Sequence, residues 1–241
     1  MLIQEFKQLI QQSHEIVFFG GAGVSTESDI PDFRSASGLY TTSKNESYPP
    51  EYMLSRSCFI NDTESFYEYY KSHMIVTHAK PNQAHLALAH LEKIGKLKAV
   101  VTQNIDGLHQ MAGSKNVLEL HGSIYRNYCM QCHQFYDLTA IIESDAIPRC
   151  SKCGNIIKPD VVLYEEGLNM DVVNRAIQHI QRADLLIVGG TSLKVYPAAG
   201  LLDYFKGDYL VLINRDATPY DRLATLNFNE SIGHVLSKAI L

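Results

Sequence analysis

The stretch Ala99-Val100-Val101-Thr102-Gln103-Asn104-Ile105-Asp106-Gly107-Leu108-His109 decides the fold class of this 241-residue chain. It begins with an apolar run that is too short for a helix and indicates a buried strand. The run is followed by four polar side chains, those of Gln103, Asn104, Asp106 and His109. In open α/β sheets, ligands bind just beyond the carboxyl ends of the strands. Because the loop holds more hydrogen-bonding groups than a turn requires, it predicts a binding site at the end of a strand.

The rest of the chain repeats this pattern, with short apolar runs separated by helical periodicity. Further strands are predicted from the apolar runs at residues 16–19, 117–120, 185–188 and 210–213. Helices are predicted over residues 82–94 and 170–181, and an opening helix is indicated by the spacing of Leu2, Phe6, Leu9 and Ile10. Strands that alternate with helices favour an α/β fold, with a mostly parallel sheet and helices on both of its faces.

Two segments interrupt the alternation and predict separate units. Residues 38–76 contain Pro49-Pro50 and an aromatic-rich helical pattern, which indicates a helical insertion. Residues 125–157 contain four cysteines and indicate a small module. The remaining segments, 1–37, 77–124 and 158–241, are therefore expected to form the domain that contains the sheet.

The composition is typical of a globular protein. Hydrophobic residues make up 46% and charged residues 20% of the chain, and its length allows a large core. There are 21 basic and 26 acidic residues, and the net charge of -5 disfavours nucleic acid and anionic membranes as partners. No apolar run approaches the roughly 20 residues that a membrane span requires, and the polar start lacks the apolar core of a signal peptide. A cytoplasmic protein is therefore expected.

Four of the five cysteines occur in two pairs, Cys129-Met130-Gln131-Cys132 and Cys150-Ser151-Lys152-Cys153, with 17 residues between them. Each two-residue gap lets both thiolates reach one metal ion, and two such pairs complete a tetrahedral zinc site. Disulfides or redox-active pairs are the alternatives, but no export signal is present and redox motifs do not come as matched pairs. With four protein ligands, the predicted Zn²⁺ is structural rather than catalytic. Cys58 stands apart and is expected to be a small buried apolar residue.

A glycine-rich turn follows the first predicted strand. The two glycines of Gly21-Ala22-Gly23 would let the backbone approach a pyrophosphate, beside a helix start whose free N–H groups favour anions. The turn departs from the dinucleotide fingerprint, because Thr26 stands in the place of the third glycine and the expected ribose-binding acid is missing. An ordinary dehydrogenase is therefore not expected. Asn214 and Asp216, after the last predicted strand, are another candidate ribose contact.

The loop Ile30-Pro31-Asp32-Phe33-Arg34-Ser35 allows two interpretations. Asp32 and Arg34 could form a surface ion pair, which contributes less than about 1 kcal/mol to stability. Alternatively, the aromatic ring and the guanidinium suit a flap that covers a flat ring and a phosphate.

Together these segments resemble the sirtuin family of NAD-dependent protein-lysine deacylases, in its bacterial form, over nearly the whole chain. The resemblance is carried, in the same order along the chain, by Gly21-Ala22-Gly23-Val24-Ser25, Pro31-Asp32-Phe33-Arg34-Ser35, residues 102–109, His121-Gly122, the paired cysteines, Lys158-Pro159-Asp160-Val161-Val162-Leu163-Tyr164, Gly190-Thr191-Ser192-Leu193 and Val195-Tyr196-Pro197. Two positions depart from the family pattern. Gly20 stands where threonine is usual, and Asp29 stands where glycine is usual, although aspartate tolerates a left-handed backbone.

The resemblance implies a Rossmann-like NAD-binding domain, a small zinc-binding module, and a cleft between them that holds NAD and an acyl-lysine. The residues implied to contact NAD are Gly21, Ala22, Gly23, Ser25, Thr26, Phe33, Arg34, Gln103, Asn104, Ile105, Asp106, His121, Gly190, Thr191, Ser192, Asn214 and Asp216. Val161, Val162, Leu163 and Tyr164 would bind the substrate, and the segment 161–163 would pair with it as a strand. The partners implied are acetylated proteins or peptides, and the oligomeric state stays open.

The resemblance also implies a reaction. The acyl oxygen attacks the nicotinamide ribose and expels nicotinamide, and His121 then acts as general base on a ribose hydroxyl. Asn104 and Asp106 would form the catalytic pocket that receives nicotinamide. The products would be free lysine, nicotinamide and O-acyl-ADP-ribose. The other histidines, among them His73 and His85, are expected at surface or helix positions.

The same resemblance indicates which acyl groups the protein is expected to remove. Family members that favour succinyl or malonyl groups carry a Tyr-x-x-Arg pair whose guanidinium binds the acyl carboxylate. The corresponding stretch here is Tyr67-Glu68-Tyr69-Tyr70, in which Tyr70 replaces the arginine, so acetyl or other neutral acyl groups are expected.

Two other functions stay open at this point. An NAD-dependent protein ADP-ribosyltransferase would share the NAD pocket and pass ADP-ribose to a protein. A nucleic-acid-binding protein could use the zinc knuckles, but the net charge of -5 and the lack of clustered arginine and lysine disfavour it.

Overall fold

A six-stranded parallel sheet forms the larger part of the structure, a computed structural model that describes residues 1–33, 38, 40 and 48–241. Its strand order is β3-β2-β1-β7-β8-β9, and every neighbouring pair is parallel. The strands are β1 (Ile16–Gly20), β2 (Leu97–Thr102), β3 (Val117–Glu119), β7 (Leu185–Gly189), β8 (Tyr209–Ile213) and β9 (Leu226–Phe228). The predicted α/β fold with a parallel sheet is confirmed, and β9 is a strand that the sequence did not predict.

Helices cover both faces of this sheet, as predicted. One core lies beneath α1 (Leu2–Gln12), α6 (Gln83–Lys93) and α10 (Ile232–Ile240), and the other beneath α9 (Met170–Arg182) and the 3₁₀ helix η4 (Ala198–Tyr204). Successive strand residues enter opposite cores, because side chains alternate across a strand. Phe18 therefore belongs to the first core and Phe19 to the second. This burial on both faces explains why the strands read as continuous apolar runs.

The order in which the chain adds strands to the sheet reverses between β1 and β7. The chain adds β2 and β3 on one side of β1, and β8 and β9 on the far side of β7. The connections after β1 and β7 therefore leave the sheet on opposite sides, and this divergence opens a crevice at the carboxyl ends.

The turn after β1 differs from the expected helix start. It contains two 3₁₀ helices, η1 (Ala22–Val24) and η2 (Thr26–Ser28), and η2 is followed by Asp29 with a left-handed φ of 62°. The departure at Gly20 also has a local cause. A Cβ at this position would lie 2.6 Å from the ring of Phe18, so the packing of Phe18 leaves no room for a side chain.

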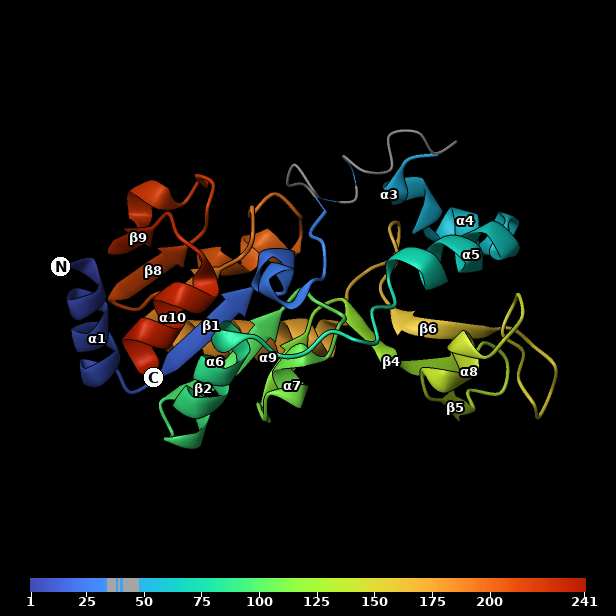
Figure 1. The fold of residues 1–241 in the computed structure, drawn as a ribbon, viewed down its shortest axis with the longest axis horizontal. Coiled ribbons are helices and arrows are strands. Elements are labelled where there is room, and N and C mark those ends of the chain that lie inside the picture. The colour runs from blue at the N-terminus through green and yellow to red at the C-terminus, as the bar shows by residue number, and fades with distance from the viewer. Residues whose placement is uncertain (34–37, 39, 41–47) are drawn as a thin grey trace.

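A second, antiparallel sheet carries the cysteines. It contains β4 (Gly122–Cys129), β5 (Phe135–Tyr136) and β6 (Ile157–Val161) in the order β5-β4-β6. Four helices share its core, namely α3 (Pro50–Met53), α4 (Arg56–Asn61), α5 (Thr63–His73) and α8 (Thr139–Ile142). Figure 1 shows this assembly at the opposite end of the molecule from α1 and β9. The helical segment and the cysteine module, which the sequence presented as separate interruptions, thus bury one common core.

Three further features complete the description. The short helix α7 (Leu108–Met111) follows β2, and the 3₁₀ helix η5 (Asp221–Leu223) precedes β9. Cys58 is buried, as predicted. Among the described residues, no helix combines the length and apolarity needed to cross a bilayer.

His85 and His109 form a buried pair beneath the sheet. Their ring centroids are 4.7 Å apart, and both side chains are almost fully buried. His85 stands at a helix position, as expected, because it lies in α6. Nδ1 of His85 accepts the N–H of Asn82 in the capping box of α6. Nε2 of His85 and both ring nitrogens of His109 have no hydrogen-bond partner among the described residues. Burial lowers the pKa of His85 to about 4, and burial followed by the charge of His85 lowers the pKa of His109 well below its ordinary value.

This pair should make the protein less stable in acid. Because the folded pKa of His85 is below the unfolded value, stability is fully present above pH 6.5 and is lost as the pH falls toward 4. His85 alone should account for about 3 kcal/mol of this loss. His85→Gln keeps a capping-box acceptor but does not titrate, so its free energy of unfolding should decline less between pH 6.5 and 4. Urea titrations of both proteins across this pH range would measure the difference. An equal decline in the free energy of unfolding for both proteins would contradict the role assigned to His85.

Candidate functional site

A cavity of about 730 Å³ lies where the two sheets meet. Its wall is built from the ends of β1, β2, β7 and β8, from the β3–β4 turn, from the segment that follows β6, from the end of α5 and from the start of α10. The sequence-predicted residues on this wall are Gly21, Ala22, Gly23, Ser25, Thr26, Phe33, Gln103, Asn104, Ile105, Asp106, His121, Val161, Val162, Leu163, Tyr164, Gly190, Thr191, Ser192, Asn214 and Asp216. Arg34 lies outside the described residues. Segments far apart in the sequence thus line one cavity at the crevice of the sheet.

The glycine turn packs against the turn after β7 with no space for side chains. The N–H of Gly23 donates to the carbonyl of Gly190 at 2.8 Å. A Cβ at Gly21 would lie 2.8 Å from Cβ of Thr191, and one at Gly23 would lie 2.8 Å from Cα of Gly190. The two glycines are therefore needed for the close approach of these two turns.

Asn214 lines this cavity and has one buried donor that is unused. Its Oδ1 accepts the N–H of Thr191 at 2.8 Å, which fixes the orientation of the amide. Its Nδ2 is buried and has no hydrogen-bond partner among the described residues. Gln103 reaches the same place, since its Nε2 donates to Oγ1 of Thr191 at 3.1 Å. A buried donor without a partner is costly, and a hydroxyl or phosphate oxygen of a bound nucleotide would satisfy it.

Ser25, Asn104 and Asp106 form a hydrogen-bonded chain on the wall. Nδ2 of Asn104 donates to Oγ of Ser25 at 3.0 Å, and Oγ of Ser25 donates to Oδ2 of Asp106 at 2.6 Å. Oδ1 of Asp106 accepts the N–H of Leu108 at 2.9 Å. Burial raises the pKa of the Asp106 carboxyl, and the hydrogen bonds from Ser25, Leu108 and Asn104 act in the opposite direction. These bonds hold the carboxylate of Asp106 and the amide of Asn104 in one orientation.

His121 stands in the β3–β4 turn, where the chain passes from one sheet to the other. Its Nδ1 lies 2.9 Å from the carbonyl oxygen of Gln103, and a carbonyl only accepts, so Nδ1 carries the proton and Nε2 is the basic nitrogen. Burial lowers the pKa of His121, and the hydrogen bond to Gln103 offsets only part of this. The imidazole is therefore neutral near pH 7 and able to accept a proton at Nε2.

The remaining polar residue of the loop after β2, His109, does not line the cavity. It lies on α7, with its ring against His85 and Phe18. Of the four polar side chains of this loop, three line the cavity and the fourth is buried in the core.

Several residues on the wall were not predicted. His73 stacks on Tyr69 with ring centroids 4.2 Å apart and lines the cavity together with Met74. Other wall residues that no sequence pattern predicted are Glu27, Glu165, Glu166, Lys194 and Glu230. These five residues belong to no distinctive local motif, and the fold brings them to the wall from four separate segments.

The predicted substrate segment extends beyond a strand. β6 ends at Val161, and Val162 then donates its N–H to the carbonyl of His121 at 3.0 Å. Tyr164 forms a parallel bridge with Ser55, at the start of α4. The segment is thus held on one side by the turn of His121 and on the other by the helical insertion.

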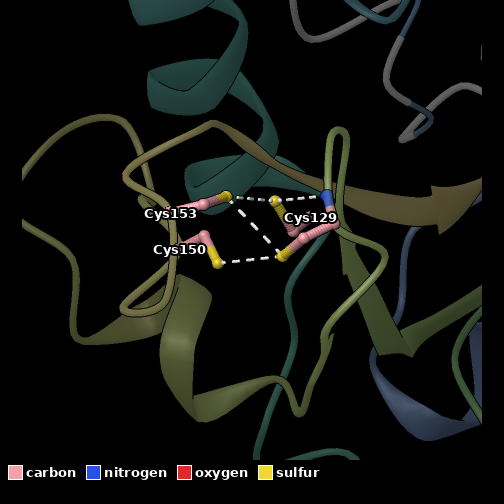
Figure 2. A group of neighbouring side chains, drawn as sticks. Cys129, Cys150 and Cys153 are labelled. Carbon is pink, nitrogen blue, oxygen red and sulfur yellow. Dashed lines mark hydrogen bonds between the residues drawn. The ribbon is translucent and has the colours of Figure 1, made fainter.

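The four paired cysteines converge on one point. Their sulfur atoms all lie within 4.8 Å of one another, with Cys129 3.3 Å from Cys153 and Cys132 3.5 Å from Cys150. Tetrahedral Zn²⁺ with bonds of about 2.3 Å would place its sulfurs about 3.8 Å apart, so the cluster fits this ion. Figure 2 shows the sulfurs turned toward a common centre. The site is formed by soft ligands alone and is closed, as expected for structural zinc.

Tyr136 contributes to this centre. Its hydroxyl donates to Sγ of Cys150 at 3.2 Å, and this hydrogen bond is the largest of the causes that lower the pKa of Cys150 to about 6. A metal ligand must be a thiolate, so the phenol favours the state that binds zinc.

Comparisons with known proteins agree with this architecture. A family model described as the Sir2 family matches residues 21–197. An NAD-dependent protein deacetylase of Clostridium tetani is 62% identical over 234 residues, which are 97% of this chain and 95% of that protein. Another of the same name, from Clostridium acetobutylicum, is 62% identical over 239 residues, with 99% and 98% covered.

Solved structures give the same result. A Sir2 variant with a deacetylated p53 peptide and 3′-O-acetyl ADP-ribose matches with a TM-score of 0.90 and 39% identity, covering 99% of this chain and 97% of that one. A complex of a Sir2 homologue with NAD matches with a TM-score of 0.90 and 37% identity, covering 98% and 92%.

Loss of one zinc ligand should unfold the cysteine module. A structural zinc supplies roughly 10–16 kcal/mol of apparent free energy at neutral pH, and Cys129 and Cys150 belong to the core shared with α4 and α5. Cys150→Ala should therefore lose bound zinc and ligand binding together. Cys58→Ala is the matched control, because Cys58 is buried in the same core but lies outside the cluster. Elemental analysis of the purified proteins gives the answer, and fully folded protein without zinc would refute the role.

Proposed function

Because the chain belongs to the Sir2 family, we propose that it is an NAD-dependent protein deacetylase that removes acetyl groups from lysine side chains. The observation that carries this function is the hydrogen bond from Nδ1 of His121 to the carbonyl of Gln103, which leaves Nε2 as the basic nitrogen on the wall of a cavity with nucleotide-binding features. Relatives that are 62% identical over nearly the full chain have the same activity in their names.

The residues of the sheet would hold NAD. The turn at Gly21 would receive the pyrophosphate, and Nδ2 of Asn214 would find its missing acceptor on the nucleotide. Asn104 and Asp106 would orient the carboxamide of nicotinamide, since their hydrogen bonds to Ser25 already fix both side chains. When bound, NAD supplies the electrophilic ribose carbon and the hydroxyl that finally accepts the acetyl group.

His121 would take the proton from that ribose hydroxyl. Its Nδ1–H bond to the carbonyl of Gln103 keeps Nε2 as the acceptor throughout and holds the ring in place. Because burial lowers the pKa of His121, the ring stays unprotonated until a substrate donates to it.

Zinc would act through structure only. Cys129, Cys132, Cys150 and Cys153 would hold it, and four sulfur ligands leave no position for water or substrate. Its contribution is to stabilise β4 and β6, which carry the turn after His121 and the start of the substrate segment.

The substrates are acetylated proteins or peptides, and the acyl pocket favours neutral groups. Tyr70 is buried on the cavity wall beside the apolar residues Leu54 and Met74. Burial raises its pKa as well, so its hydroxyl stays neutral and offers no positive charge to an acyl carboxylate.

Four cysteines that must stay reduced to bind zinc favour a reducing compartment, and we assign the enzyme to the cytoplasm.

His121→Ala should remove the base and leave the fold intact. Deacetylation should fall by at least about 10²–10⁴-fold, the usual contribution of general-base catalysis, while bound zinc is unchanged. His14→Ala is the control, because His14 is exposed and does not line the cavity. Initial rates with NAD and an acetyl-lysine peptide would measure this, and near-normal turnover would exclude His121 from the mechanism.

The products identify the reaction. With NAD and an acetyl-lysine peptide, mass spectrometry should find free lysine peptide, nicotinamide and O-acetyl-ADP-ribose. ADP-ribosylated protein in their place would establish the transferase alternative, and NAD that is bound but not consumed would leave a binding protein.

Acetyl peptides should be better substrates than succinyl peptides of the same sequence. A succinyl carboxylate would enter a pocket with Tyr70 in place of a guanidinium, and an unpaired buried charge is costly. We expect kcat/KM to be at least about tenfold lower for the succinyl peptide. A succinyl rate above the acetyl rate would overturn the proposed acyl preference.

A further inference from the structure

The tight turn after the substrate segment contains Glu165 at a position whose backbone conformation would be unstrained for glycine. The N–H of Glu166 donates to the carbonyl of Leu163 at 3.0 Å and closes the turn. Glu165 is the third residue of this turn and has a φ of 74°, a left-handed conformation that favours glycine. A strained residue beside a functional site suggests a role for its side chain.

Part of that role is structural. Oε2 of Glu165 accepts the N–H of Ser57 at 2.9 Å and its hydroxyl at 2.7 Å. Ser57 lies in the first turn of α4, where free N–H groups attract a carboxylate. These bonds orient the side chain of Glu165 but require only an acceptor, which a neutral amide would also provide.

The negative charge of Glu165 has no counterpart among the described residues. The neighbouring Glu166 is different, because its carboxylate forms an ion pair with Lys158 at 3.1 Å. Glu165 forms no ion pair with any described lysine, arginine or histidine. It is exposed and lines the cavity, directly after Tyr164. An oriented and unpaired carboxylate therefore stands at the edge of the cavity.

We infer that Glu165 selects acyl-lysine peptides that carry a positively charged side chain near the modified lysine. The inference rests on the proposed function, because it places the peptide along residues 161–164. A peptide in that position has to pass Glu165, and an arginine or lysine of the peptide would supply the missing positive charge. A glutamate in the same place would be repelled.

The test compares acetyl-lysine peptides that differ only in having arginine, alanine or glutamate at each of the two positions on either side of the acetyl-lysine. For the wild-type protein, kcat/KM and the affinity of fluorescent versions of the peptides should favour arginine over glutamate at one or more positions. A preference of about threefold to fivefold is expected for a partly exposed ion pair, and it should shrink as salt is added.

Three substitutions test the role of this charge. Glu165→Gln keeps an acceptor for Ser57 and should bring the arginine-to-glutamate ratio close to one. Glu68→Gln is the matched control, since Glu68 is an exposed glutamate of α5 that does not line the cavity, and it should keep the ratio. Glu165→Gly removes the side chain and relaxes the backbone, and it should lose the preference too.

The outcomes separate the two proposals. Charge-selective binding that Glu165→Gln abolishes would support the inference even if no peptide were deacetylated, a result that would defeat only the proposed function. Deacetylation with the same ratio in the wild type and Glu165→Gln would overturn the inference and leave the function intact. Absence of peptide binding would overturn both.

Discussion

The whole site depends on one close backbone approach, at Gly122. Here the chain leaves the parallel sheet and enters the antiparallel one, with a φ of 78°. A Cβ at this position would lie 1.8 Å from the carbonyl oxygen of Asp160, so β4 and β6 could not approach as they do with any other residue. Arg126 strengthens the junction, because it pairs with Glu119 of β3 at 2.6 Å and with Asp160 of β6 at 2.7 Å. His121 is placed between the sheets by this geometry.

The two sheets contribute different chemistry to the cavity. The parallel sheet supplies close-packed turns, a buried amide donor at Asn214 and the oriented pair of Asn104 and Asp106. These groups suit a polar nucleotide whose position must be fixed. The antiparallel sheet and its helices supply an apolar wall, at Leu163 and Tyr70, which suits the stem of an acylated lysine. His121 lies at the boundary, where the two ligands would meet.

Zinc and the aromatic helix α5 together stabilise the antiparallel sheet. The antiparallel sheet has only three strands, and its core is completed by Phe66 and Tyr67 of α5 and by the buried cysteines. Tyr67 also donates its hydroxyl to the carbonyl of Ile157. Small units of this kind seldom bury enough apolar surface to be stable alone. A metal ion and helix α5 therefore stabilise the three-stranded sheet, which lacks the larger core of the parallel sheet.

The sequence by itself determined the local features: the strands, which are apolar because helices cover both faces, the zinc ligands, whose spacing is set by the size of one ion, and the motif residues of the family. It also indicated that Cys58 is buried. It did not determine that His109 and His85 pair in the core, since a polar loop residue and a helix residue carry no sign of their burial. The tertiary structure decided that the helices of residues 50–73 and the cysteine module share one core, and it brought Glu165, His73 and Lys194 to the cavity. The physical reason is distance: spacing rules describe contacts between near neighbours in the chain, whereas these contacts join residues that only the packing of two sheets brings together.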